Sequence, residues 1–452
     1  MKLSKRRLTP ALQVFIYSVF GILFLLAIAL RISLYHVETS DYTVFVSQWY
    51  DFIQSHGGFA AFKYNFSNYN VPYLYLLALT TYLPIPKLIA IKSLSVVFDI
   101  VLGLFTYLII NLKYKRSIAA AIGALVVLFA PTIFINSSAW GQCDAIYTAF
   151  CLGSLYFVLK ERPAWACVFF GLAFSFKLQA IFFLPVLLAL LLRRKLSLKH
   201  LVLIPAIFLL MLVPAFIAGR DAWSLLTIYA GQITTGGVGV GAVGQFTGTG
   251  GGRFNNGGTQ PFNGGDRGHF NGGNPGGFNG GGHGSGGASS SSLTYNAPTF
   301  YQWLPAGAPE YWKWIGIGLA VLVVLGIGTL VLRSKKQLTA GTILKIALVF
   351  AVVIPFLLPE MHERYFYLAD VLSIIYAFYF PRYFFVAVVM QLCSLLSYAP
   401  YMLQTQVVDL KYVAVGVLLI GVCTLVDLVF ALRSRAGDDA QIPKGASLET
   451  RS

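Results

Sequence analysis

The chain has 452 residues, of which 57% are hydrophobic and 11% are charged, and its mean hydropathy is +0.71. Soluble domains carry roughly 25% charged residues, so this composition excludes a string of ordinary soluble domains. The net charge of +16 comes mostly from short basic clusters between apolar runs, as the positive-inside rule produces, so we expect membrane lipids and no nucleic acid as partners.

The first predicted span runs from about Ala11 to Leu30, directly after a basic segment, Met1 to Pro10. No small-residue cleavage site follows it, so we interpret it as a retained signal-anchor with a cytoplasmic N-terminus. A polar and aromatic segment, residues 31–71, comes next. We expect it to form a helical or irregular first outer loop.

Further apolar runs recur at lengths near the ~20 residues that a helix needs to cross a bilayer. They lie at about 72–84, 88–112, 117–136, 140–159, 164–176, 178–192, 201–218, 312–332, 342–358, 367–380, 384–402 and 411–432. The pattern predicts an all-α polytopic membrane protein with a transmembrane helix bundle of about 11–13 spans.

Basic clusters orient these spans and predict a multi-pass membrane protein with a cytoplasmic N-terminus. The clusters expected on the cytoplasmic side are 2–7, 113–116, 160–162, 193–195, 333–336, Arg382 and 433–435. The loops expected outside are 31–71, 137–144, the surroundings of Lys177, 219–311, 358–366 and 403–410. The alternation fails once, because two full spans between residues 72 and 112 would place the cluster at 113–116 outside. We therefore expect the short run at 72–84 to be a partial or re-entrant helix.

The chain divides into four predicted parts. Residues 1–230 form an N-terminal transmembrane catalytic part that includes the outer loop 31–71, and 293–435 form a C-terminal transmembrane part. Between them, residues 231–292 are rich in Gly, Asn and Ser and poor in aliphatic residues, which predicts a flexible extracytoplasmic insert. Residues 436–452 are expected to be a flexible cytoplasmic tail.

Two acidic residues of the first outer loop, Glu38 and Asp41, lie just past the first span. A carboxylate near an apolar surface loses hydration and can act as a general base toward a hydroxyl. An ordinary solvated carboxylate is the alternative. Asn68 and Asn70 lie among aromatic residues in the same loop, a mixture that suits a sugar but also occurs in any interfacial aromatic belt.

The next two outer loops add an amide, a carboxylate and a cation. Trp140, Gln142 and Asp144 precede a predicted helix, where Asp144 could cap the helix or contact a substrate. Lys177 stands alone between two apolar runs, and a half-buried cation is costly unless an anion compensates it. A lipid phosphate is the natural candidate, with snorkelling to the interface as the alternative.

The fourth outer loop carries the densest group of titratable residues. These are Glu360, His362, Glu363 and Arg364, with Asp370 slightly deeper. An arginine can hold a phosphate with two parallel hydrogen bonds, and a histidine can donate to a phosphate or carry a proton. The three carboxylates would hold these cations in place. A purely structural ion-pair cluster is the alternative.

No cofactor is expected from the sequence. The five cysteines form no CxxC pair and lie mostly within apolar runs, so they indicate neither a disulfide framework nor a metal cluster. The fourth loop reads His-Glu-Arg-Tyr, which is not the HExxH pattern of a zinc protease. A divalent metal remains possible, but no ligand set stands out.

Taken in order, these motifs resemble the GT-C membrane glycosyltransferases, in particular prokaryotic proteins similar to GPI-type mannosyltransferases. The segments that carry the resemblance are 41–42 with 49–50, 67–77, Trp140-Gly141-Gln142-Cys143-Asp144, 176–177, 296–298 and Met361-His362-Glu363-Arg364-Tyr365-Phe366. The resemblance extends from about residue 11 to 432 outside the Gly-rich insert. The group's loop at the place of that insert is short, so the insert bears on which acceptor is used.

The resemblance implies inverting transfer of a hexose, with mannose favoured, from a polyprenyl-phosphate donor to a hydroxyl of a glycan, lipid or protein outside the cytoplasm. It also implies that Asp41 is the base and that Lys177, His362 and Arg364 stabilise the leaving phosphate. A carboxylate would then stand on one side of the substrate and the cations on the other. Two other hypotheses stay open: a transporter or flippase of a lipid-linked sugar, and a surface-display protein that works through the Gly-rich segment.

Overall fold

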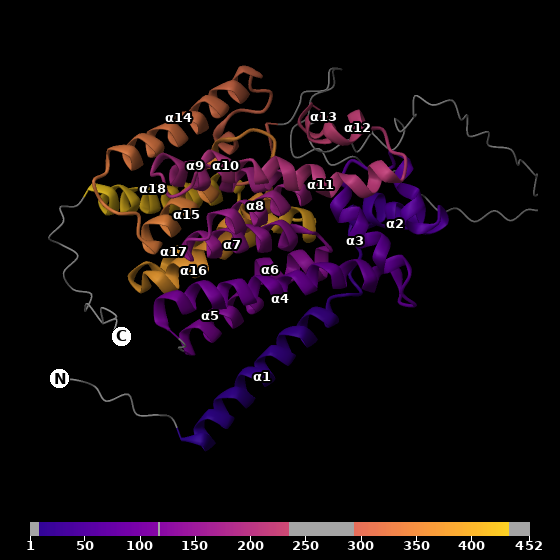
Figure 1. Cartoon of the computed structure of the whole chain (residues 1–452), viewed down its shortest axis with the longest axis horizontal. Coiled ribbons are helices and arrows are strands. Elements are labelled where there is room, and N and C mark those ends of the chain that lie inside the picture. Colours follow the sequence, from indigo (N-terminus) through magenta and orange to yellow (C-terminus); the bar gives the residue numbers. More distant parts are fainter. Residues whose placement is uncertain (1–8, 116–117, 235–292, 434–452) are drawn as a thin grey trace, which may run out of the picture.

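The computed structural model describes residues 9–115, 118–234 and 293–433, and most of them are helical (Figure 1). The α-helices are α1 (Pro10–Ser33), α2 (Ser47–Ser55), α3 (Val71–Thr81), α4 (Lys87–Tyr114), α5 (Ile118–Phe129), α6 (Pro131–Phe134), α7 (Asp144–Leu159), α8 (Pro163–Phe176), α9 (Leu184–Leu192), α10 (Leu198–Leu201), α11 (Leu203–Ile217), α12 (Ala222–Leu226), α13 (Ile228–Thr234), α14 (Tyr311–Arg333), α15 (Ala340–Leu357), α16 (Tyr367–Tyr379), α17 (Phe384–Met402) and α18 (Leu410–Arg433).

Short elements connect these helices. They are the π-helices η1 (Tyr42–Val46) and η3 (Ile135–Trp140), the 3-10 helices η2 (Gly58–Lys63), η4 (Leu178–Phe183), η6 (Phe300–Trp303), η7 (Glu363–Phe366) and η8 (Pro381–Tyr383), and the strands β1 (Thr294–Tyr295) and β2 (Met361–His362). β1 and β2 pair in parallel, with Tyr295 opposite His362. Although residues 235–292 separate them in the chain, this pair joins the start of the C-terminal part to the fourth predicted outer loop.

The predicted fold class is confirmed. Within the described residues, seven helices are long and apolar enough to cross a membrane, or eight if the bent pair 118–129 and 131–140 is one span. Four shorter apolar helices accompany them: Val71–Thr81, Asp144–Leu159, Pro163–Phe176 and Leu178–Leu192. The predicted 11–13 spans are reached only when these short helices are counted, because each runs for 11 to 16 residues.

Helix α3 removes the exception in the predicted topology. Its 11 residues rise roughly 16 Å, about half the hydrocarbon thickness of a bilayer. The turn after it stays beside the first loop, since the Tyr82 hydroxyl accepts from the Phe59 backbone N–H at 3.3 Å and Lys87 pairs with Asp51 at 2.8 Å. Only α4 therefore runs the length of the bundle between residues 72 and 114.

The predicted span 117–136 is broken. Pro131 cannot supply the backbone donor that would continue α5, and the chain bends there by 49°. The helix then widens into the π-helix η3, whose residues Asn136 to Trp140 are all buried. This distortion brings the second predicted outer loop into the interior of the protein.

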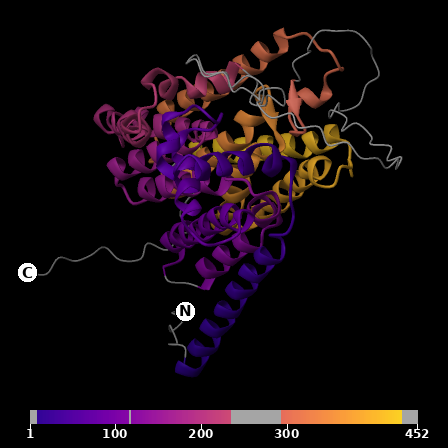
Figure 2. The ribbon, with the colours of Figure 1, turned by 90° about the vertical axis from the view of Figure 1, so that its right-hand side faces the viewer.

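The centre of the bundle is formed by α4, α7 and α8 on one side and α15 to α18 on the other. Helix α1 stands apart from both groups over most of its length (Figure 2). Only its last turns are anchored, where Ala27 and Arg31 are fully buried. A narrow apolar hollow separates the rest of α1 from α4 and α5.

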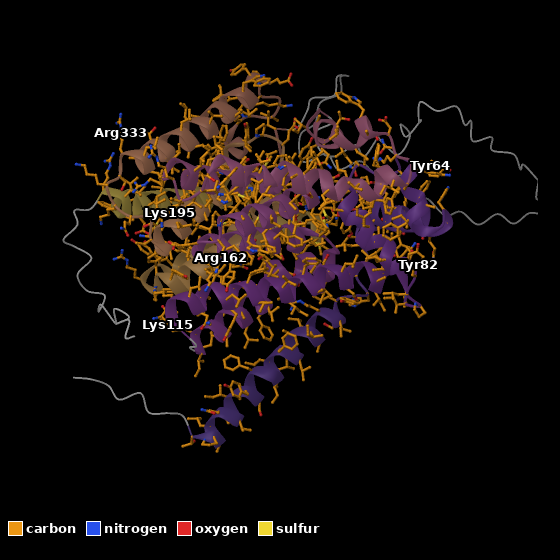
Figure 3. The ribbon with its side chains drawn as sticks, in the orientation of Figure 1. Tyr64, Tyr82, Lys115, Arg162, Lys195 and Arg333 are labelled. Carbon is orange, nitrogen blue, oxygen red and sulfur yellow. The ribbon has the colours of Figure 1, made fainter. Side chains whose placement is uncertain are left out.

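Four basic residues from the predicted cytoplasmic clusters lie toward one end of the bundle. Figure 3 shows Lys115, Arg162, Lys195 and Arg333 toward that end and Tyr64 and Tyr82 at the opposite one. This is the separation that the alternating basic clusters predict. The Gly-rich segment lies outside the described residues except for 231–234, which end α13. The division of the chain into four parts stays a prediction.

Candidate active site

The first outer loop turns back into the bundle just after α1. The Thr39 hydroxyl donates to the backbone carbonyl of Trp140 at 3.1 Å, and the backbone N–H of Asp41 donates to the Tyr401 hydroxyl at 2.9 Å. Asp41 directly precedes η1. These two hydrogen bonds hold its segment against the second loop on one side and the end of α17 on the other. Its side chain remains 22% exposed.

The second loop supplies two donors to the Asp41 carboxylate. Trp140 Nε1 and Gln142 Nε2 both donate to Asp41 Oδ2, at 3.0 and 2.5 Å. Gly141, between them, has φ 79°, a left-handed conformation that side chains disfavour. This glycine ends η3 and reverses the chain, so that both neighbours point at the same oxygen.

Asp144 lies next to this pair and holds the lysine of the third loop. Lys177 Nζ donates to Asp144 Oδ1, and Asn136 Nδ2 donates to Asp144 Oδ2 at 3.0 Å. Asp144 is fully buried and is the first residue of α7, where the helix dipole favours a negative charge. The carboxylate thus compensates a lysine that would otherwise be costly to bury.

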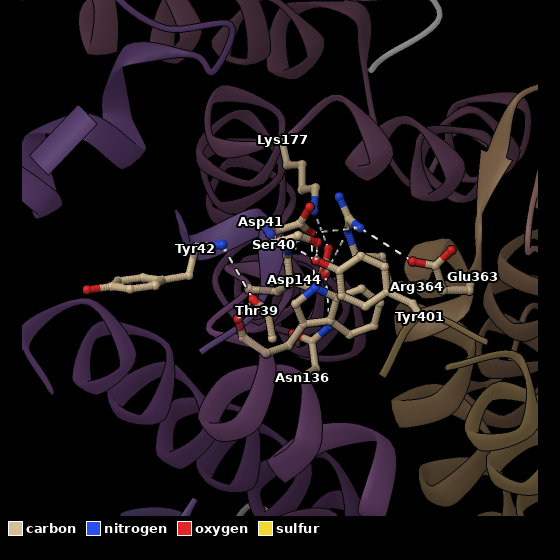
Figure 4. Close-up of polar contacts among 12 residues, drawn as sticks. Thr39, Ser40, Asp41, Tyr42, Asn136, Asp144, Lys177, Glu363, Arg364 and Tyr401 are labelled. Carbon is tan, nitrogen blue, oxygen red and sulfur yellow. Dashed lines mark hydrogen bonds and ion pairs between the residues drawn. The ribbon is translucent and has the colours of Figure 1, made fainter. Parts of the chain in front are cut away.

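Arg364 joins the two carboxylates into one group (Figure 4). Its Nη1 lies 3.5 Å from Asp41 Oδ2 and 3.5 Å from Glu363 Oε1, and its Nε lies 3.9 Å from Asp144 Oδ2. We refer to Asp41, Asp144, Lys177, Glu363 and Arg364 as the charged cluster. Its members come from four loops that are up to 323 residues apart in sequence.

Burial tunes the charge of this cluster. It raises the pKa of Glu363 to about 7, because desolvation and the nearby Asp41 and Asp144 outweigh the attraction of Arg364. The cluster thus holds two cations, Lys177 and Arg364, against two carboxylates, Asp41 and Asp144. Glu363 adds a third negative charge when it is deprotonated. The expected separation of a carboxylate from the cations is not what is found, since all five groups are in contact.

His362 lies beside the cluster, where its neutral form is favoured. Burial lowers its pKa well below the usual value, and Arg364 and Lys177 lower it further. Its ring stacks on Tyr295 of β1 at 4.8 Å, and its Nε2 is buried with no hydrogen-bond partner among the described residues. Of the two expected roles, donating a hydrogen bond to a phosphate is the one that the neutral ring can fill.

Other predicted site residues have partners elsewhere. Glu360 pairs with Lys313 at 2.5 Å, and Asp370 accepts from the Ser394 hydroxyl at 2.7 Å, so neither holds the cations of the fourth loop as expected. Asn70 caps α3 and donates to the backbone carbonyl of Ser175 at 2.9 Å. The Asn68 backbone carbonyl accepts from Gln232, and Glu38 is exposed.

Two residues at the site were missed by the sequence analysis. Tyr401 stacks on Trp140 at 4.4 Å and hydrogen-bonds to Ser40 and Asp41, and Asn136 donates to Asp144. Tyr401 ends a predicted span, where an aromatic residue reads as part of an interfacial belt. Asn136 could have been found from the sequence, because it is a polar residue directly before the second predicted outer loop.

Within residues 9–115, 118–234 and 293–433, no group of three or more His, Cys, Asp or Glu side chains could hold a metal ion. The charged cluster contains three carboxylates, but a guanidinium and an ammonium already occupy the space between them. Burial also raises the pKa of Cys143, next to the cluster, which keeps it a thiol. What the cluster offers is a partly open carboxylate beside two fixed cations.

Residues 66–246 match the model of glycosyltransferase family 87, a GT-C-type family. Over this segment, which is less than half of the chain, the protein is similar to the GT-C-type integral membrane glycosyltransferases. The match agrees with the resemblance predicted from the motifs, and no curated protein matches the chain significantly. The matched segment contains Trp140, Gln142, Asp144 and Lys177. Asp41 and the loop of Arg364 lie outside the matched residues, but the fold brings them into contact with the matched segment.

Proposed function

We propose that this protein is a glycosyltransferase that transfers a hexose, with mannose favoured, from a polyprenyl-phosphate donor to a hydroxyl of a glycan, lipid or protein, with inversion at the anomeric carbon. The observation that carries the proposal is the Asp41 carboxylate, 22% exposed and 3.5 Å from the Arg364 guanidinium. The base and the cation are in contact in this structure, so the substrate would part this ion pair and stand between the two groups. The glycosyltransferase family 87 match favours this reaction over transport of a lipid-linked sugar.

Asp41 is the base in this proposal. The donors that reach its carboxylate among the described residues converge on Oδ2, which leaves Oδ1 for a substrate hydroxyl. The acceptor O–H gives its proton to Asp41 as its oxygen bonds to the anomeric carbon from the face opposite the phosphate. The bond from that carbon to the phosphate oxygen breaks, and its electron pair leaves with the lipid phosphate.

Lys177 and Arg364 stabilise the charge that grows on the leaving phosphate. Arg364 Nε is buried with no hydrogen-bond partner among the described residues, and so is Nε2 of the neutral His362, so both have capacity for an anion. Glu363 in its protonated form leaves the two cations balanced by Asp41 and Asp144 alone. The phosphate would bind Arg364 most strongly in that state.

We place the reaction on the extracytoplasmic side of a prokaryotic plasma membrane. The support is the separation of Lys115, Arg162, Lys195 and Arg333 from the aromatic end of the bundle, because basic residues favour the cytoplasmic side. We also expect Glu38, Asn68 and Asn70 to line the path of the sugar or acceptor, since they share the first outer loop with Asp41.

The proposal is tested by incubating purified protein in lipid nanodiscs with radiolabelled polyprenyl-phosphate mannose or glucose. A total membrane lipid and glycan extract serves as acceptor. Labelled product from wild type, with an inverted linkage and none from Asp41→Asn, supports the proposal. Equal turnover by both proteins would reject Asp41 as the base. Movement of intact labelled donor across the bilayer without product would favour a flippase.

A further inference from the structure

Three polar residues lie on one face of α4, in a span that is otherwise apolar. Lys92, Ser95 and Asp99 follow one another at spacings of three and four residues, which stacks them along one side of the helix. Each is at most 1% exposed. Ionisable groups inside a membrane bundle are costly, so a role for them is the default expectation.

Lys92 holds the backbone on both sides of the charged cluster. Its ammonium donates to the carbonyls of Leu34 at 3.2 Å, Tyr35 at 3.2 Å and Val37 at 2.5 Å, just past the end of α1, and to Ala139 at 3.1 Å. The first three carbonyls lie four to seven residues before Asp41. The fourth belongs to the residue before Trp140. One buried cation thus joins the two segments that meet at the Asp41 carboxylate.

Ser95 and Asp99 continue this pattern along the same face. The Ser95 hydroxyl donates to the backbone carbonyl of Gln142 at 2.6 Å. Asp99 Oδ2 accepts from Arg31 Nε at 2.8 Å and from the Ser137 hydroxyl at 2.6 Å, while Oδ1 accepts from the Tyr367 hydroxyl at 3.4 Å. Arg31 lies in the last turn of α1, Ser137 lies in η3, and Tyr367 follows Arg364 by three residues.

Packing alone does not account for this arrangement. Buried ion pairs rarely stabilise a fold more than apolar side chains of similar volume would. Lys92 and Asp99 also do not pair with each other. Instead, they bond to segments that carry Asp41, Trp140 and Arg364, and Ser95 bonds to Gln142 itself.

We propose that Lys92, Ser95 and Asp99 are positioning residues that hold Trp140 and Gln142 against Asp41. Lys92 and Ser95 act through backbone carbonyls of the first and second loops, and Asp99 acts through the side chains of Arg31 and Ser137. The inference rests on the proposed role of Asp41. It assigns no contact with substrate to the three residues. Because reacting groups need placement to within a fraction of an ångström, a small shift of these loops would reduce turnover more than donor binding.

The sharpest test is a double-mutant cycle between Ser95→Ala and Gln142→Ala, measured as donor-dependent transfer in nanodiscs. We expect Ser95→Ala to lower kcat about tenfold, with KM for the donor changed by less than about twofold. In the Gln142→Ala background, Ser95→Ala should lower kcat by a smaller factor than in wild type, since one of the two side chains that it positions is gone. Multiplicative effects, or a Ser95→Ala protein with wild-type kcat, would overturn the inference.

Ser154→Ala is the matched control. The Ser154 hydroxyl is equally buried and donates to the carbonyl of Ala166 at 2.8 Å, a contact between α7 and α8 away from the charged cluster. It should leave kcat unchanged. If Ser154→Ala lowers kcat as much as Ser95→Ala does, the loss reflects general destabilisation and the positioning role fails.

Amide hydrogen exchange separates this inference from the proposed function. We expect faster exchange over residues 137–144 in Ser95→Ala and over 34–41 in Lys92→Met, with no such change in Ser154→Ala. If wild type transfers no sugar but these exchange changes occur, the proposed reaction fails and the positioning of the loops stands. If wild type is active, Asp41→Asn is inactive, and neither kcat nor exchange changes in Ser95→Ala, the positioning role fails alone.

Discussion

The charged cluster at Asp41 differs from a second buried cluster, which surrounds Asp427, in the kind of backbone that supplies its members. Asp427 accepts from Tyr376 at 2.6 Å, Lys345 at 2.8 Å and Tyr383 at 3.0 Å, with Lys345 also over the ring of Phe380 at 4.5 Å. Lys345, Tyr376 and Asp427 come from α15, α16 and α18, and Tyr383 comes from the 3-10 helix η8. Around Asp41, most of the residues come from loops, the π-helix η3 and the 3-10 helix η7, with Asp144 at the start of α7.

The two clusters also differ in what they leave unused. Both oxygens of Asp427 have donors, and among the described residues Lys345 pairs with no other carboxylate. Near Asp41, Arg364 Nε, His362 Nε2 and Asn136 Oδ1 are buried without hydrogen-bond partners among the described residues. A fully paired carboxylate is what stability needs, whereas unused polar groups on irregular backbone are what a ligand needs.

Replacing Asp41 with asparagine would break this comparison most strongly. Asparagine keeps the size of the side chain but cannot take the acceptor proton, so we expect kcat to fall about 10³-fold, within the range of general-base losses. Transfer of radiolabel under saturating donor measures the change. Asp51→Asn is the matched control, an exposed carboxylate of the same loop paired with Lys87. Similar losses in both variants would mean that the loop, and not the base, was damaged.

Arg364→Gln should have the next largest effect. The guanidinium is the only described side chain that contacts three carboxylates of the charged cluster, and the proposed mechanism uses it on the leaving phosphate. We expect kcat to fall about 10²-fold, the usual loss for one electrostatic donor, and Arg364→Lys to restore only part of it. Arg382→Gln, an exposed neighbour of Asp427, is the control and should leave kcat unchanged. Unaltered turnover in Arg364→Gln would exclude its proposed role.

Lys345→Met tests whether the cluster around Asp427 serves stability and not the reaction. It leaves Asp427 buried without its ammonium partner, which costs about 3 kcal/mol of stability in comparable pairs. We expect a lower melting temperature in nanodiscs and an unchanged kcat per folded molecule. The double variant Lys345→Met, Asp427→Leu should recover most of the loss. A fall in kcat without a fall in melting temperature would show that this cluster also serves the reaction.

Much of the fold follows from hydropathy, because lipid requires apolar helices and their lengths can be read from the chain. Even the short α3 was anticipated from the basic cluster beyond it. The bend at Pro131 and the π-helix η3 were not, although Pro131 is itself a signal. Whether a proline ends a helix or only bends it depends on neighbouring helices, which sequence spacing does not describe.

The site was predictable in its membership more than in its contacts. Asp41, Gln142, Asp144 and Lys177 were singled out from separate loops, and the structure brings them together. The partners of Glu360 were not predictable. Its backbone is left-handed, with φ 59°, so the chain turns between Glu360 and Glu363, and only the latter contacts Arg364. Such a turn depends on the pairing of β1 and β2 across residues 235–292.

The smallest expected effect concerns pH and Glu363. Its pKa, about 7, is raised mainly by burial. Above pH 7 it therefore adds a negative charge beside Arg364, with Asp41, Asp144 and the phenol of Tyr398 also facing it. A phosphate donor should then bind less well, and we expect its KM to rise about threefold from pH 6 to pH 8. Glu363→Gln stays neutral and should flatten that rise.

Stability should respond to the same group in a defined direction. Since the folded-state pKa of Glu363 lies above the ordinary value of 4.5, the native protein favours the protonated form. Its contribution is complete below about pH 4.5 and is lost as pH rises toward and through 7, so Glu363→Gln should gain melting temperature relative to wild type mainly at pH 8. Glu360→Gln, on the same loop but paired with Lys313, should leave the pH profile of KM unchanged. If the donor KM rises with pH as steeply in Glu363→Gln as in wild type, another group is titrating. There would then be no reason to treat the cluster with protonated Glu363 as the form that binds phosphate.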